Sequence, residues 1–139
     1  MSNLKLQGNM PEIIEIEKLI LSCQQVEMPV SHYHIDGVYV RSLFIPADTV
    51  LTGKIHNFES IAILAQGTIK IANGDDAYEI TAPAIMVDKP GIKRIGYAVT
   101  DVTFITVHKT DKKEVPDIEE QLVSATFEEY EIKKLEVMA

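Results

Sequence analysis

Four basic side chains lie in segments with the alternating pattern of β-strands. Arg41 is in VYVRSLFI, Lys54 and His56 are in TVLTGKIH, and Arg94 is in IKRIGYAV. Because successive side chains of a strand point to opposite faces, Lys54 shares a face with His56, and Arg41 shares one with Tyr39. Buried cationic side chains need an anion, and a guanidinium matches the geometry of a carboxylate or a phosphate. If these faces point into one cavity, the five residues form a cationic pocket for a small anionic ligand.

Acidic residues near these segments offer a different explanation of the arginines. Glu59 and Asp88 could pair with them inside the protein, which would leave less positive charge for a ligand. Glu59 and Ser60 also lie close to His56 in the sequence, but as strand neighbours they point to opposite faces and cannot both face that histidine. We therefore predict no catalytic triad in this region.

The histidines suggest a second kind of site. His32 and His34 are two residues apart and share one strand face, where they could join His56 or His108 in holding a divalent metal. Two histidines at this spacing are a weak signal, and the alternative is an ordinary polar strand face. His108 ends the last strand-like segment, where it could instead line the mouth of a barrel or cap the strand.

The strand-like pattern repeats with a period of two from Val30 to Lys109. Short β-branched runs alternate with turn-forming pairs, among which Asn73-Gly74 is the strongest hairpin signal. Eight or nine strands at this spacing predict a sandwich or a barrel with closed edges. Helical patterns flank them, over residues 10–27 and in short stretches within 115–136. The predicted fold is therefore mainly β, with an N-terminal helix and short C-terminal helices.

Two stretches resemble the signature motifs of the cupin family. The first motif is a glycine, His-x-His, a glutamate and a closing glycine at set spacing, and here His56 matches the second histidine and Gly67 the closing glycine. The second motif is Pro-x-Gly-x-x-His, and Gly91 of the Pro90-Gly91 turn matches its glycine. The resemblance covers residues 30–109 and implies a double-stranded β-barrel of the jelly-roll type.

The same resemblance implies that the usual cupin metal site is degenerate. Lys54 stands in place of the first histidine, Ser60 in place of the glutamate, and Arg94 in place of the third histidine. Of the four usual ligands only His56 remains. We therefore expect no cofactor, with a divalent metal on relocated histidines as the alternative. Among cupins, the chain resembles small stand-alone proteins of bacteria and their phages.

The flanking helices favour an oligomer. An apolar stripe at helical spacing in the first of them is formed by Ile13, Ile16 and Ile20. This stripe must pack on the barrel wall or on a second subunit. Near the C-terminus, Thr126 followed by Glu129 is a capping box that starts a helix. Apolar stripes at both ends of a small barrel predict a homodimer or a higher homo-oligomer.

The composition limits the class of protein. A chain of 139 residues with 46% hydrophobic and 24% charged residues suits one domain, residues 1–139, around one core. The sequence has no apolar run near the ~20 residues that a membrane span needs, and no secretory signal. The net charge of −8 disfavours nucleic acid and membrane as partners. We expect a cytoplasmic protein, in the host cytoplasm or the virion if a phage encodes it.

Three functions fit these patterns. We favour a non-catalytic cupin-like protein whose cationic barrel holds a small anion such as a nucleotide, a sugar phosphate or a carboxylate. The alternatives are an assembly component, for instance a viral one, that uses the barrel as an oligomeric scaffold, and a metal-dependent enzyme that uses the relocated histidines. The barrel interior distinguishes them, because a metal site, an anion site and a packed core would each support one function.

Overall fold

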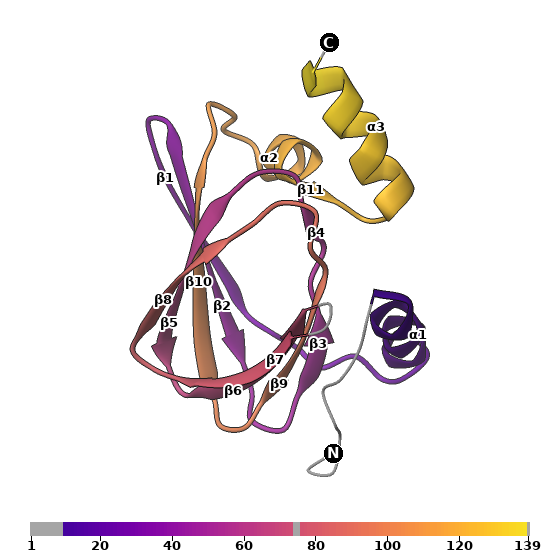
Figure 1. Ribbon diagram of the computed structural model, residues 1–139. Coiled ribbons are helices and arrows are strands. Elements are labelled where there is room, and N and C mark those ends of the chain that lie inside the picture. Colours follow the sequence, from indigo (N-terminus) through magenta and orange to yellow (C-terminus); the bar gives the residue numbers. More distant parts are fainter. Residues whose placement is uncertain (1–9, 74–75, 139) are drawn as a thin grey trace.

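The computed structural model describes residues 10–73 and 76–138, in which one helix lies beside a body of strands and two lie at one end of it (Figure 1). The helices are α1 (Met10–Leu21), α2 (Val115–Leu122) and α3 (Phe127–Met138). The strands are β1 (Val30–Ile35), β2 (Val38–Ile45), β3 (Val50–Thr52), β4 (Ile55–His56), β5 (Ser60–Gln66), β6 (Thr68–Asn73), β7 (Asp76–Thr81), β8 (Ala84–Asp88), β9 (Arg94–Ala98), β10 (Val102–Lys109) and β11 (Val123–Ser124). No helix among the described residues is both long and apolar enough to cross a membrane.

Two antiparallel sheets face each other across the core (Figure 1). The larger sheet has the strand order β1-β2-β10-β5-β8, and the smaller has the order β3-β9-β6-β7. The chain passes from the larger sheet to the smaller at Gly67, between β5 and β6. Gly67 has a φ of 89°, and a Cβ there would overlap the backbone oxygen of Asp101. Only glycine fits this crossing, which explains why the closing glycine of the first motif stands there.

The main core fills one end of the space between the sheets. Its buried side chains come from both sheets and are Leu43, Ile45, Leu64, Ile69, Ile71, Ala98 and Val102. On β2, Leu43 and Ile45 are two residues apart, as the alternating pattern predicts for one strand face. Burying each large apolar side chain contributes roughly 1.5 to 3 kcal/mol, so this cluster holds the two sheets together.

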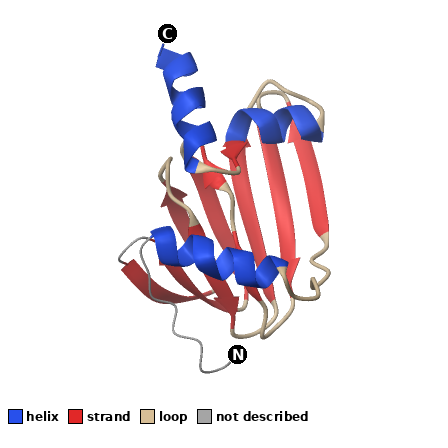
Figure 2. Ribbon diagram, turned by 90° about the vertical axis from the view of Figure 1, so that its right-hand side faces the viewer, coloured by secondary structure: helices blue, strands red, loops and turns tan. Residues whose placement is uncertain are grey.

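Helix α1 covers the outer face of the smaller sheet (Figure 2). Ile13 is fully buried there, against Ala72, Ile95 and Tyr97, and Ile16 packs beside it. Of the two partners considered for the apolar stripe, the barrel wall is therefore the one observed. The helix ends at Leu21, earlier than the predicted residue 27.

The end of α1 is fixed by a side chain outside the helix. The Gln25 amide donates 2.9 Å hydrogen bonds to the carbonyls of Ile20 and Cys23. These bonds satisfy carbonyls that a continuing helix would have used, so the chain turns away before Met28 and Pro29 rather than at them. The predicted end near residue 27 took account only of the Met28-Pro29 pair that follows it.

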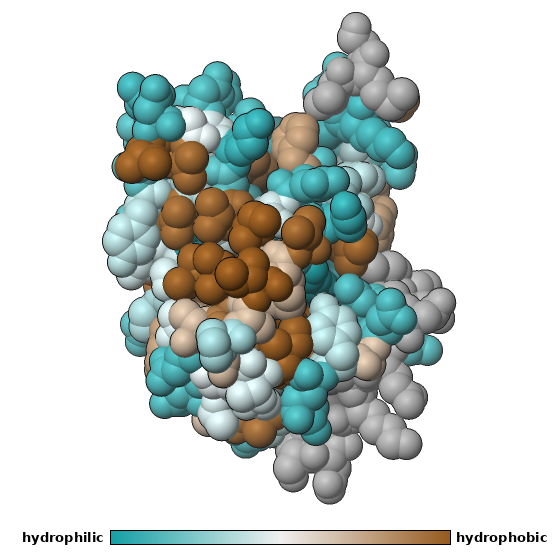
Figure 3. All heavy atoms as spheres, turned by 60° about the vertical axis from the view of Figure 1, so that its left-hand side comes forward, coloured by the Kyte–Doolittle hydropathy of each residue, from teal (hydrophilic) through white to brown (hydrophobic). Residues whose placement is uncertain are grey.

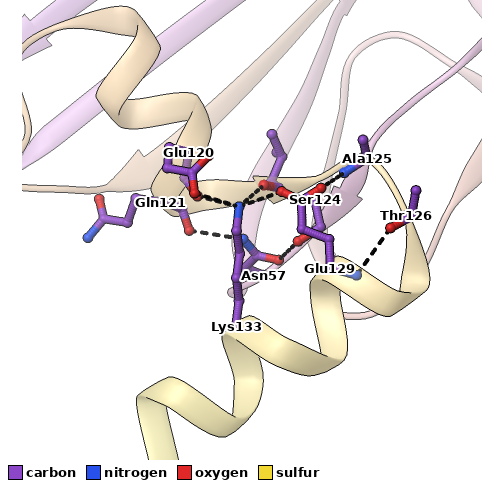
Figure 4. Close-up of polar contacts among 9 residues, drawn as sticks. Asn57, Glu120, Gln121, Ser124, Ala125, Thr126, Glu129 and Lys133 are labelled. Atoms are coloured by element: carbon purple, nitrogen blue, oxygen red, sulfur yellow. Dashed lines mark hydrogen bonds and ion pairs between the residues drawn. The ribbon is translucent and has the colours of Figure 1, made fainter.

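Helix α3 begins at the predicted capping box (Figure 4). The Thr126 hydroxyl accepts a hydrogen bond from the Glu129 amide at 3.1 Å, and the Glu129 carboxylate accepts one from the Ala125 amide at 3.2 Å. The first bond satisfies an amide that the first turn of a helix leaves unpaired, and the second ties the chain just before the helix to that turn.

Two side chains join the C-terminal elements to one another and to the barrel (Figure 4). Asn57, just after β4, accepts a hydrogen bond from the Ser124 hydroxyl at 2.7 Å. Lys133 of α3 donates to the carbonyls of Glu120 and Val123 at 2.6 and 3.0 Å. These contacts hold α2, β11 and α3 at the end of the barrel where β4 lies.

Candidate functional site

A cavity of about 150 Å³ lies between the two sheets. Four of the five residues predicted for an anion site line it, namely Arg41 from β2, Lys54 just before β4, His56 from β4 and Arg94 from β9. Most of the apolar part of the wall is formed by Leu43, Ile45, Leu51, Ile69, Ile71 and Phe104. The structure therefore brings polar groups from separate segments to one apolar cavity.

Tyr39 does not line this cavity, although it was predicted to. Alternation places it on the same face of β2 as Arg41, but two residues nearer to α2. Its side chain is 3% exposed and packs against Ile118 and Leu122 of that helix. The pattern identified the strand face, but it contained no sign that α2 would cover this part of it.

Arg94 is paired inside the protein with Asp88. The guanidinium Nη2 donates a hydrogen bond to Oδ1 of Asp88, a carboxylate that is 2% exposed and also lines the cavity. The second oxygen, Oδ2, is buried without a hydrogen-bond partner. Internal pairing, the alternative considered for the arginines, thus holds for Arg94. Glu59 instead pairs with Lys89 at 3.4 Å on the surface.

Arg41 and Lys54 have no such partner. Neither side chain has a hydrogen bond or an ion pair within the described residues. Lys54 is exposed, however, and after the hydrogen bond from Lys133 its charge also helps to lower the pKa of Glu129.

Arg41 is half-buried and lies opposite Thr106 of β10 in the sheet register. Thr106 is 8% exposed and also lines the cavity. Thr106 was not predicted from the sequence, although alternation places it on the same strand face as His108.

His56 lies at the cavity wall among these charges. Its Nδ1 shares a 3.3 Å hydrogen bond with the Ser60 hydroxyl. Burial lowers the pKa of His56 below its ordinary value, the nearby Asp88 carboxylate opposes this, and Arg94 and Arg41 lower the pKa further. His56 is therefore neutral at pH 7 and can donate or accept one hydrogen bond at the cavity.

The other histidines gather around Tyr39. His32 Nδ1 and the Tyr39 hydroxyl share a 2.7 Å hydrogen bond, and the His34 ring lies 5.2 Å from the Tyr39 ring between centroids. The Tyr39 ring lies 5.9 Å from that of His108, which lies 5.8 Å from that of His56. All four histidines of the chain thus form one row of rings with Tyr39. Across residues 10–73 and 76–138, no group of three or more His, Cys, Asp or Glu side chains is placed to hold a metal ion.

Solved structures show which fold this is. A cupin superfamily protein from Desulfitobacterium hafniense matches with a TM-score of 0.53 at 8% identity, over 64% of this chain and 83% of that one. An RmlC-like cupin family protein with a double-stranded β-helix fold, from Methanocaldococcus jannaschii, matches with a TM-score of 0.52 at 13% identity, over 61% and 82%. The chain has a cupin-like fold. KdgF from a Halomonas species matches it with a TM-score of 0.54 at 12% identity, over 66% and 86%.

The cupin-like fold confirms the fold class predicted from the two degenerate motifs. No family model matches the sequence, and no curated protein matches it. Identities of 8 to 13% show the fold alone. The function of this cupin-like protein must therefore be argued from its own cavity.

The buried histidines of this cupin-like protein should make its stability depend on pH. Burial, together with the neighbouring His56 and Arg41, lowers the pKa of His108 to about 4. The unfolded chain, with a histidine pKa of about 6.5, then binds more protons than the folded one between pH 6.5 and 4. The folded state therefore has its full stability above pH 6.5 and loses stability as the pH falls toward 4. We expect His108 to account for a loss on the order of 2 to 3 kcal/mol by pH 4.

Urea unfolding at pH 7, 5.5 and 4.5 measures this loss. His108→Phe keeps a ring between Tyr39 and His56 but cannot be protonated, so its free energy of unfolding should fall less steeply with acid than that of the wild type. The matched control is His34→Phe on the exposed strand β1, which should keep the wild-type slope. If the free energy of unfolding of His108→Phe falls with acid as steeply as that of the wild type, His108 is not the source of the pH dependence.

Proposed function

We propose that this cupin-like protein is a non-catalytic binding protein that holds a small anionic molecule in the cavity between its sheets. The observation that supports the proposal most is the pair of cations at the cavity wall, Arg41 and Lys54, which have no ion-pair partner in the described part of the chain. They stand in a protein whose net charge is −8. Arg41 is half-buried, so water solvates it incompletely and an anion is favoured as its missing partner, whereas the exposed Lys54 only adds positive charge at the cavity wall.

The chemistry of the wall narrows the class of anion. Arg41 offers a planar fork that fits a carboxylate or a phosphate in bidentate geometry, and Lys54 adds a second charge. The apolar side chains would contact a short carbon skeleton. A cavity of about 150 Å³ has room for several water-sized groups, which favours a small organic acid or a phosphate group over a whole nucleotide.

Binding without catalysis is proposed because the polar groups do not form a reactive set. Ser60 bonds His56, but Ser60 is absent from the cavity wall. The Asp88 carboxylate, which would have to serve as the acid of a Ser-His-Asp triad, instead forms an ion pair with Arg94. A resident metal is not proposed either, because the positive charges of Lys54 and Arg94 stand beside His56 where the usual cupin ligands would be. The exposed free thiol of Cys23 is in keeping with the proposed cytoplasmic location.

A thermal-shift experiment with inorganic phosphate, sulfate and malonate tests the proposal. An anion at about ten times its Kd should stabilise the fold by about 1.4 kcal/mol, which raises the Tm by several degrees. Sodium chloride at equal ionic strength serves as the reference. Arg41→Gln should abolish the shift, because it removes the unpaired fork without breaking an ion pair.

Lys109→Gln is the matched control for charge. It removes one positive charge from the exposed end of β10, outside the cavity wall, and should keep the full shift. The proposal fails if no anion raises the Tm above the chloride reference, or if Arg41→Gln responds as the wild type does.

One observation favours the second candidate function, an assembly component in which the barrel is a scaffold. Arg94 is already neutralised by Asp88, so one of the two arginines expected to hold a ligand has a protein partner. An unchanged Tm with every anion tested would make this function the better explanation.

A further inference from the structure

The cavity wall contains a carboxylate that the protein uses only in part. Asp88 ends β8, is 2% exposed and lines the cavity. Its Oδ1 accepts the hydrogen bond from Arg94, whereas Oδ2 is buried without a hydrogen-bond partner. Across residues 10–73 and 76–138, no other buried side-chain nitrogen or oxygen lacks a partner. Because an unpaired buried acceptor is costly, Oδ2 needs a donor.

The neighbouring donors of the protein do not supply this bond. An arginine fork can bind both oxygens of a carboxylate, but Arg94 contacts only Oδ1 of Asp88. Ser60 lies opposite Asp88 in the register of β5 and β8, and its hydroxyl instead shares a hydrogen bond with His56. A molecule in the cavity is therefore the remaining source of a donor.

Alternation along β8 points Asp88 between the two sheets. Ala84 and Met86, on the same face of this strand, pack against the main core, which lies between the sheets. Ile85 and Val87 are exposed on the opposite face, the outer side of the larger sheet, where Figure 3 shows a hydrophobic area. The terminal torsion of an aspartate side chain is broad, so a small rotation presents Oδ2 to a donor in the cavity.

Arg41 lies near enough to Asp88 for one small molecule to contact both. The two residues line the same cavity of about 150 Å³. Both also act on His56, because burial lowers the pKa of this histidine most, the Asp88 carboxylate raises it, and Arg94 and then Arg41 lower it. The cavity therefore offers a cation for an anionic group and, close to that cation, an acceptor for a hydrogen-bond donor.

We propose that the anion is a short hydroxy acid, whose carboxylate binds Arg41 and whose hydroxyl donates to Oδ2 of Asp88. This inference rests on the proposed function and adds to it the residue that selects the ligand. A neutral hydroxyl is favoured over an ammonium group, since Arg94 already neutralises Asp88 and two further cations, Arg41 and Lys54, stand in the cavity wall. An acid without a donor would leave Oδ2 unpaired and should bind more weakly.

Three acids of the same shape test the hydroxyl. 2-Hydroxyisobutyrate, pivalate and 2-aminoisobutyrate carry a hydroxyl, a methyl or an ammonium group at the same position of one skeleton. In thermal-shift titrations of the wild type, we expect 2-hydroxyisobutyrate to bind with a Kd at least tenfold below that of pivalate, and also below that of 2-aminoisobutyrate. Lactate and propionate repeat the comparison with a narrower skeleton. This series needs no variant, so it does not depend on how substitutions affect folding.

The double variant Asp88→Leu/Arg94→Met assigns the preference to Asp88. It removes the acceptor together with the charge that the acceptor neutralises, and it leaves Arg41 to bind a carboxylate. The hydroxy acid and its methyl counterpart should then bind with Kd values within about twofold of each other. Glu15→Leu/Lys18→Met is the matched control, because it makes the same two substitutions at an exposed ion pair outside the cavity wall, and it should keep the tenfold preference.

The failure of this inference differs from the failure of the proposed function. If malonate raises the Tm but pivalate and propionate bind as tightly as their hydroxy counterparts, the proposed function stands and the inference is overturned, with water as the partner of Oδ2. A preference that survives in Asp88→Leu/Arg94→Met also overturns it, because another group must then recognise the hydroxyl. If no anion raises the Tm above the chloride reference, both fail.

Discussion

Replacing Asp88 with asparagine should lower the free energy of unfolding by about 3 kcal/mol. The substitution keeps the shape of the side chain but removes the charge that compensates Arg94. Breaking a buried ion pair by removing one partner usually costs 3 to 5 kcal/mol, because the other charge stays in a poorly solvated place. The lower end of this range applies here, since the Arg94 side chain keeps 21% exposure while that of Asp88 keeps 3%. The Tm should fall by roughly 10 °C.

The surface offers a matched control for this change. Glu59 pairs with Lys89 at 3.4 Å, and both side chains are 64% exposed. Glu59→Gln makes the same kind of substitution one residue from Ser60, and it should cost less than about 1 kcal/mol. The double variant Asp88→Leu/Arg94→Met should recover most of the lost stability, because an apolar pair leaves no charge unpaired. Equal, small effects for the single Asp88→Asn and Glu59→Gln substitutions would contradict the argument.

The same variant also probes the cavity. Asp88→Asn frees the Arg94 guanidinium, so phosphate should raise the Tm of this variant by more degrees than it raises that of the wild type. The larger phosphate shift is expected only if the cavity binds anions. A destabilised variant that shows no larger phosphate shift would leave the ion-pair argument intact but would count against the proposed function.

Sequence patterns predicted most of the fold because turns and alternation are local properties of the chain. Gly67, the closing glycine of the first motif, is required because the backbone of Asp101 approaches it closely. The face of Arg41 followed from a period of two. The single strand predicted through Lys54 and His56 was wrong, because β3 ends at Thr52 and β4 begins at Ile55, which leaves Lys54 between two strands of different sheets. The pairing of Arg94 with Asp88 could be considered but not decided, since it depends on how two strands lie across the cavity.

Other features could not be predicted from the sequence because they depend on which helix or strand covers which face of a sheet. Tyr39 and Arg41 share a strand face, and only the position of α2 separates them. The outer face of the larger sheet did leave a signal in the sequence. Segments such as SIAILAQ and AIMVD are apolar at almost every position, which is the pattern of strands covered on both sides. Alternation alone predicts that they are strands, but not which element lies on each side.

The second large effect is expected at Glu17, which neutralises a buried lysine. The Lys93 side chain is 3% exposed, and its ammonium pairs with the Glu17 carboxylate at 2.8 Å and donates to the Gly53 carbonyl at 3.0 Å. The Thr52 hydroxyl donates to the same carboxylate at 2.5 Å. Glu17 lies on α1, so this network fastens the helix to the barrel. Neither residue was singled out from the sequence, because no local pattern links them.

Glu17→Gln should therefore lower the free energy of unfolding by 3 to 5 kcal/mol in urea denaturation at pH 7. Glu15→Gln is the matched control on the same helix, since Glu15 and Lys18 form a pair whose side chains are 74% and 70% exposed, and it should cost less than about 1 kcal/mol. Lys93→Met should cost less than Glu17→Gln. It leaves a carboxylate with 28% exposure and a hydroxyl partner, whereas Glu17→Gln leaves an ammonium that water hardly reaches. The reverse order of the two costs would show that the burial of Lys93 does not control how α1 is held.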